Sequence, residues 1–149
     1  MRAHFLLAAS LLLATPAIAG TEDQGRIEAR GTVTGSCSVD DLTIQLQQQG
    51  DGKLRGSGQV AVSQTTNTEW TIGRTERQND SGSTQFDAEL NFRGPGNMQL
   101  QSKHNKDDKK TVNGLQQGNA TVDVTLTPRG GTFAAGVYQT QTIVKCVVK

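Results

Sequence analysis

The chain is poor in the residues on which most enzyme active sites are built. Its 149 residues include 2 histidines, 2 cysteines, 1 tryptophan and 1 tyrosine. His4 lies in a segment that we expect to be cleaved, so His104 alone is left to serve a triad or a metal, and there is no Gly-x-Ser-x-Gly elbow. A zinc site on this one histidine would need carboxylates and both cysteines as further ligands. The sequence therefore predicts no catalytic residue, no metal site and no cofactor.

Paired carboxylates are the catalytic arrangement that the composition leaves open. A small periplasmic hydrolase that uses Asp87 with Glu89, or Asp107 with Asp108, stays an alternative. Acidic side chains on strands and loops are ordinarily solvated charges. The aromatic share is only 4%, which leaves little with which to build a platform for a sugar. We expect a protein that is not an enzyme.

The first 19 residues have the pattern of a secretory signal peptide. Arg2 supplies the positive start, Phe5 to Ala14 form an apolar run, and Ala17-Ile18-Ala19 is a small-x-small cleavage site. A membrane anchor would need about 18 to 20 unbroken apolar residues, whereas Thr15 and Pro16 interrupt this run. We expect an exported protein whose mature chain is not inserted in a membrane.

The mature chain is small and formally neutral. Cleavage leaves 149 − 19 = 130 residues, which suits one domain. Loss of Arg2 lowers the number of Lys and Arg from 15 to 14, against 14 Asp and Glu. A neutral chain has no global field that would attract nucleic acid, so no nucleic-acid partner is expected.

Both cysteines lie in the exported part of the chain. An even count in an oxidising compartment is the usual sign of a structural disulfide, so we expect a bridge between Cys37 and Cys146. This bridge would enclose nearly the whole domain. Two buried free thiols or a redox pair are the alternatives, although the chain has no C-x-x-C motif.

Alternation with a period of two dominates the chain. From Ile27 to Val39 every odd position is apolar, small or cysteine, and every even position is polar, which predicts a long strand. Shorter runs of the same period follow between turn residues, and no segment has a helical apolar stripe. These runs are Leu42–Leu46, Val60–Val62, Trp70–Ile72, Phe86–Phe92, Met98–Leu100, Ala120–Leu126 and Tyr138–Val148. The predicted class is all-β, a two-sheet sandwich of about seven strands.

One charged segment separates two of these runs. Lys103 to Lys110 has the sequence KHNKDDKK and contains no apolar residue, so we expect an exposed loop. Asp107 and Asp108 interrupt its positive charge and no aromatic residue lies within it, so it does not predict a nucleic-acid site.

The two ends of the chain resemble those of chaperone-usher fimbrial subunits. Gly25 to Val33, GRIEARGTV, leads within three residues to Cys37-Ser38-Val39. In that family an alternating donor strand continues as Gly-Thr-Val and reaches its first strand cysteine a few residues later. Ala135-Gly136-Val137-Tyr138 is similar to the entry into the last strand of pilin-like and spore-coat-like secreted domains. The middle of the chain shares only the strand pattern.

The resemblance implies an incomplete immunoglobulin-like (pilin-type) sandwich that lacks its final strand and exposes a groove in its core. In the family a periplasmic chaperone fills this groove, and the N-terminal strand of the next subunit replaces it at the outer-membrane usher. The implied donor side chains are Ile27, Ala29, Gly31 and Val33, and the implied groove and chaperone-pairing residues are Tyr138, Val144 and Val148. The implied organisation is a signal peptide at 1–19, an N-terminal extension and candidate donor strand at 20–34, and a pilin-like sandwich at 35–149.

The function implied is that of a structural subunit of a cell-surface fimbria, periplasmic in transit, with neighbouring pilin subunits, a chaperone and an usher as partners. The family usually pairs its first cysteine with one on the next strand, whereas here the bridge must join the first and last strands. The alternative is a self-contained secreted β-sandwich that binds a protein or carbohydrate, as an adhesin or inhibitor does. The sequence also leaves open whether Ile27 to Val33 folds back into its own domain.

Overall fold

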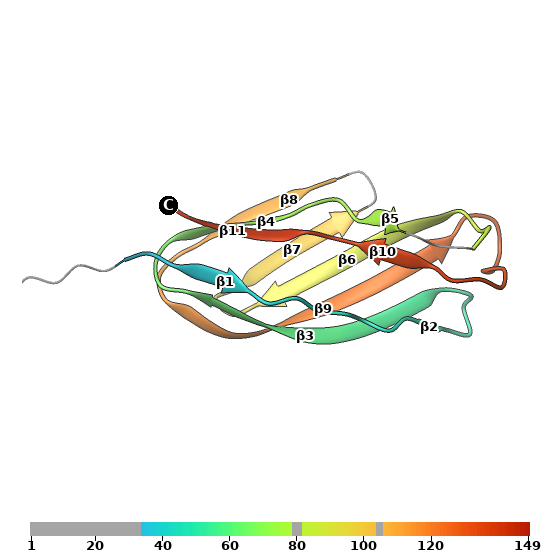
Figure 1. Ribbon diagram of the computed structural model, residues 1–149, viewed down its shortest axis with the longest axis horizontal. Coiled ribbons are helices and arrows are strands. Elements are labelled where there is room, and N and C mark those ends of the chain that lie inside the picture. Colours follow the sequence, from blue (N-terminus) through green and yellow to red (C-terminus); the bar gives the residue numbers. More distant parts are fainter. Residues whose placement is uncertain (1–33, 79–81, 104–105) are drawn as a thin grey trace, which may run out of the picture. The chain divides into compact units, whose positions relative to one another are not determined.

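The structure, a computed structural model, describes residues 34–78, 82–103 and 106–149 (Figure 1). All regular structure in these ranges is β-strand, so the predicted all-β class is confirmed. The strands are β1 (Cys37–Val39), β2 (Gln47–Gln48), β3 (Leu54–Gln64), β4 (Thr68–Ile72), β5 (Glu76–Gln78), β6 (Phe86–Gly94), β7 (Met98–Lys103), β8 (Asp108–Val112), β9 (Gln116–Pro128), β10 (Gln139–Gln141) and β11 (Val144–Val148). The described residues contain no helix that is long and apolar enough to cross a membrane.

The first sheet has the strand order β1-β3-β9-β6-β7, and β2 also pairs with β3. Its central ladder is the antiparallel pair β3–β9, which runs from Leu54 opposite Leu126 to Gln64 opposite Gln116. Inward side chains alternate with outward polar ones along β6 and β9, as the period of two predicts. The inward set forms most of the core: Val60, Val62, Phe86, Ala88, Leu90, Phe92, Ala120, Val122, Val124 and Leu126.

The second sheet is narrower. It has the order β11-β4-β8, and the short pair β10–β5 continues the strands β11 and β4. Two residues lie between Gln141 and Val144, whereas three lie between Ile72 and Glu76, so the β4–β5 side carries one extra residue at the junction. Trp70 and Ile72 of β4 are fully buried against the first sheet. The two sheets therefore form a sandwich around one core.

The strand order contains that of an immunoglobulin constant domain without its last strand, to which β7 and β8 add one strand at the edge of each sheet. If β1–β2, β3, β4–β5, β6, β9 and β10–β11 are named A to F, the first sheet contains A-B-E-D and the second contains C and F. Tyr138 forms the tyrosine corner of this fold, because its hydroxyl donates to the Ala134 carbonyl (2.8 Å) at the entry to strand F. Strand G of the complete fold would pair with F, and no strand of the described ranges does so. The predicted β-sandwich is confirmed, and the absence of a final strand from the described ranges agrees with the predicted incomplete form.

A buried polar network holds the core together near Trp70. The Trp70 indole Nε1 donates to Gln64 Oε1 (2.7 Å), and Gln64 Nε2 donates to the carbonyls of Val112 (2.9 Å) and Gly114 (2.8 Å). Gln64 is 1% exposed. A single side chain on β3 therefore satisfies groups on β4, on β8 and in the turn after β8.

The expectation of an exposed loop over Lys103 to Lys110 is wrong at both ends. Lys103 belongs to β7, and Asp108–Val112 form β8, which pairs with β4. β8 is an edge strand whose central residues are exposed, so it can carry Lys109 and Lys110 without burying charge. Lysines on an edge strand also discourage pairing with another chain. His104 lies outside the described residues.

We predict that Gln64→Met destabilises the protein by roughly 2–4 kcal/mol, because the buried Trp70 indole N–H, the buried Val112 carbonyl and the partly buried Gly114 carbonyl lose their partner. Gln59→Met is the matched control, since Gln59 is an exposed position of the same strand and should change stability by less than about 0.5 kcal/mol. The measurement is urea unfolding followed by Trp70 fluorescence. Equal loss in the two variants would contradict the role of the network.

Candidate functional site

A groove runs along the side of the sandwich where strand G would lie. It has a volume of about 1300 Å³. Its first wall is formed by residues 39–46 and 48, and its second wall by residues 133–144. In Figure 1 the two walls are the chain between β1 and β2 and the chain that includes β10 and leads into β11. The floor consists of apolar side chains of the first sheet: Leu54, Val60, Leu90, Phe92, Val122 and Val124.

In its middle part, between β1 and β2, the first wall does not pair with β3. Seven residues lie between Val39 and Gln47, but only six lie between their partners Val62 and Arg55 on β3. The extra residue forms a bulge. The last ladder bond before it runs from the Asp40 amide to Ala61 (3.3 Å). The structure therefore has no strand at Leu42–Leu46, where the sequence pattern predicts one.

Two glycines on β3 leave space for the apolar side chains of this wall. Gly56 and Gly58 face inward, and a Cβ on Gly56 would lie 2.5 Å from Ile44 Cγ2 and 2.6 Å from the Gln45 carbonyl oxygen. A Cβ on Gly58 would lie 3.1 Å from Leu42 Cδ2. The alternating residues Leu42, Ile44 and Leu46 thus pack across the glycines instead of extending the sheet.

The second wall presents an open strand edge. The Ile143 carbonyl accepts from the Gly73 amide (2.9 Å), and the Lys149 amide donates to Asn67 (2.9 Å), so odd-numbered residues of this strand bond toward β4. The backbone groups of Val144 and Val148 therefore point away from β4. Across the described ranges no strand pairs with that edge. An open edge beside an apolar floor is the arrangement that accepts an added strand.

The two ends of the groove differ. At one end the predicted disulfide joins Cys37 of β1 to Cys146 of β11, with a Cα–Cα distance of 6.1 Å. At the other end three rings form a cluster: Phe133 and Tyr138 are 4.7 Å apart between centroids, and each lies 5.9 Å from Phe86. The Arg77 guanidinium stacks over Phe86 at 4.8 Å. The groove is thus closed covalently at one end and by aromatic packing at the other.

The lining is suited to a neutral or weakly basic occupant. Asp40 and Asp41 are the charged residues of the lining, and both lie on the first wall. The floor residues retain little exposure, with Leu90 at 8% and Val124 at 7%. The floor is therefore largely covered by the side chains packed around it.

The carboxylates that could have served a hydrolase have structural partners instead. Asp87 accepts from Arg129, which raises the pKa of the Arg129 guanidinium. Glu89 accepts from the amide side chain of Gln101, and Asp108 accepts from the Gln101 backbone N–H (3.0 Å). Within the described ranges no group of three or more potential metal ligands comes together.

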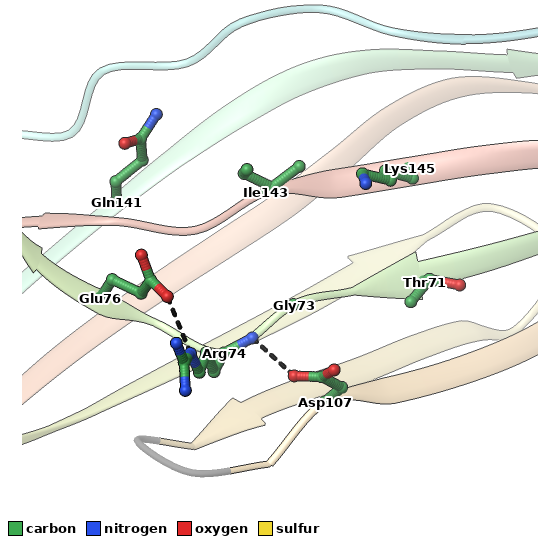
Figure 2. Close-up of a pocket in the computed structure, with 8 residues that line it drawn as sticks. All are labelled: Thr71, Gly73, Arg74, Glu76, Asp107, Gln141, Ile143 and Lys145. Atoms are coloured by element: carbon green, nitrogen blue, oxygen red, sulfur yellow. Dashed lines mark hydrogen bonds and ion pairs between the residues drawn. The ribbon is translucent and has the colours of Figure 1, made fainter.

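A second, smaller hollow lies on the outer face of the second sheet. Figure 2 shows that Arg74 connects two carboxylates there: its Nε donates to Glu76 (2.8 Å), and its backbone N–H donates to Asp107 (2.9 Å). The hollow has a volume of about 560 Å³. Its side chains bond to one another at the surface, and this arrangement shows no catalytic geometry.

The structure brings part of the predicted site together. Tyr138 and Val144 line the groove. Val148 lies beyond the disulfide, where it contacts the chain at Gly35. The predicted donor residues Ile27, Ala29, Gly31 and Val33 lie outside the described residues, so their role stays a prediction.

Sequence reasoning missed the first wall of the groove. The sequence does contain a signal for it, because the inward positions change from odd to even between Val39 and Leu42. Such a change of phase within an alternating run indicates a bulge.

Comparison with models of protein families finds no family that matches the chain, and no curated protein matches it. Among solved structures, the chain is similar to one from a chaperone–tip adhesin complex, which is described as vital for synergistic activation of CFA/I fimbriae biogenesis. The TM-score is 0.46 and the sequence identity is 10%, over 76% of this chain and 42% of that one. The chain thus spans less than half the length of the chain it matches. At this level the likeness supports neither a function nor a partner.

We predict that Gly56→Ala displaces the first wall and destabilises the protein by about 1–3 kcal/mol, because the new methyl would overlap Ile44 and a backbone oxygen. Gly50→Ala is the control, since no atom lies within 4 Å of a Cβ placed there. The measurement is the urea midpoint of each variant. A Gly56→Ala variant as stable as Gly50→Ala would show that the wall does not rest on β3.

Proposed function

We propose that the protein is a structural subunit of a cell-surface fimbria and that its groove binds an extended strand added along the outer edge of β10 and the start of β11. The observation that carries this proposal is the open edge of β10 and of the start of β11 beside an apolar floor. Main-chain hydrogen bonds to the edge would supply affinity, and alternate side chains on the floor would supply specificity.

The proposed occupant is the segment Ile27 to Val33 of a neighbouring copy. Its alternation would direct Ile27, Ala29, Gly31 and Val33 toward the floor, and its charged residues toward solvent. Seven extended residues span about 20 Å, and the wall from Val137 to Val144 spans about 23 Å at the same rise per residue. Arg26 and Arg30 also complement the two aspartates of the lining.

The resemblance of the chain ends to fimbrial subunits extends the proposal to assembly. A periplasmic chaperone would occupy the groove during transit, and an outer-membrane usher would exchange it for the neighbouring pilin subunit. The mature chain would then reside in the fimbrium at the cell surface. We propose no enzymatic activity.

One observation favours a second candidate, a self-contained secreted sandwich that binds a protein or carbohydrate. No buried side-chain nitrogen or oxygen of the described residues lacks a hydrogen-bond partner. The floor residues of the groove other than Leu54 are also more than nine-tenths covered. A sandwich with these properties could be stable alone and use its surface as an adhesin or inhibitor does.

We predict that the exported chain self-associates and that a peptide spanning Thr21 to Thr34 converts it to a monomer. The peptide would fill the groove and remove the edge on which the copies pair. Light scattering with and without the peptide measures the change in mass.

A peptide with Ile27→Asp and Val33→Asp is the control, because two charges facing the floor should prevent binding. A chain that is monomeric from the start and indifferent to the first peptide would exclude strand exchange. That result would favour the self-contained binding module.

A further inference from the structure

The first and last strands meet at one end of the groove without forming a sheet. β1 and β11 belong to different sheets, and no backbone hydrogen bond joins them in the described part of the chain. The disulfide Cys37–Cys146 is the bond that holds them together. Just before it, the chain passes Gly35, where a Cβ would come within 2.9 Å of Thr66 Cγ2 and closer still to Val148.

The distance at this bridge excludes an inserted strand. Strands that pair in a sheet lie about 4.8 Å apart, so a strand placed between two others needs about 9.6 Å between them. The Cα atoms of Cys37 and Cys146 are 6.1 Å apart. A strand bound along β11 must therefore end before the bridge.

We propose that the Cys37–Cys146 disulfide is an end-stop that sets the register of the strand bound in the groove. The bound strand pairs with the edge of β10 and then with Val144, the first residue of β11, and it cannot reach the outward backbone groups of Cys146 and Val148. This inference rests on the proposed function, because it concerns the strand that the groove binds.

The proposed occupant needs such a stop. A slip by one residue would turn its apolar side chains toward solvent, but a slip by two residues keeps them on the floor. Ala29 and Gly31 are too small to prevent a two-residue slip by shape. A covalent barrier at the end of the groove provides the register that the donor sequence specifies weakly.

Amide hydrogen exchange, resolved by residue with NMR, tests the end-stop on the unaltered chain with the peptide spanning Thr21 to Thr34. Binding should slow exchange at the Val144 amide by about tenfold or more, because this group gains a partner. Exchange at the amides of Cys146 and Val148 should not change. New protection at either of these two amides would overturn the end-stop and leave the proposed function intact. No protection at any residue, together with no change of mass, would overturn both.

A variant with Cys37→Ser and Cys146→Ser tests the cause. The circular dichroism of this variant shows whether it folds like the wild type. If it does, peptide binding should now slow exchange at the amide of position 146 or of Val148, because the bound strand can slide by two residues. An unchanged protection pattern would show that the bridge does not set the register. If the variant does not fold, a photo-crosslinker in place of Ile27 or Val33 of the peptide gives the same test on the wild type. Crosslinks to residues 146–149 would contradict the end-stop, and crosslinks confined to residues 39–48 and 133–144 would support it.

Discussion

The apolar inner face of the first sheet is the surface against which all other elements are arranged. Five strand positions share this face, and the second sheet that covers it has only three. Burial of this face is the dominant favourable term in folding, so each part that the second sheet leaves uncovered must be covered by something else. The chain between β1 and β2 covers one margin by packing across Gly56 and Gly58. The groove is the remaining gap between that margin and β11.

The difference in width between the two sheets also accounts for the position of the disulfide. The edge strands of the two sheets approach each other at one end, where no backbone bond joins them, and Cys37 and Cys146 connect them there. Cys146 lies opposite Trp70 in the register of β11 and β4, and Trp70 is fully buried. The bridge therefore lies beside a fully buried part of the core. A wall that is fixed at one end, is paired along its inner edge and has an unpaired outer edge can accept a partner without losing its own place.

The alternation of apolar and polar residues along single segments was enough to predict much of the fold. The strands β3, β4, β6, β7 and β9 each carry apolar residues at alternate positions on the inward face, and this period is visible without any partner. The sequence pattern did not predict β8, because Lys109 and Lys110 fit a strand only where that strand lies at an exposed edge of a sheet. That edge is defined by β4, which is far away in the sequence. Leu42–Leu46 shows the converse, since its alternation is the same whether the segment pairs with β3 or packs on its glycines. The resemblance of the chain ends to those of fimbrial subunits predicted a groove. The first wall of the groove could not be predicted in this way, because it depends on the register with which β1 and β2 pair with β3.

The bridge also shortens the path along which tension would travel through the domain. Tension on the chain at Thr34 reaches Cys37 three residues later and crosses a single covalent link to Cys146 on β11. The two cysteines are separated by 109 positions in the sequence, and the residues between them lie outside this path. The hydrogen-bond ladders of the two sheets do not carry this tension. The pairing of β1 with β3 cannot be pulled apart beyond Cys37, because the disulfide holds the chain there. Between its first described residues and its last strand, the protein therefore behaves as a short inextensible link, whatever the strength of its hydrogen-bond ladders.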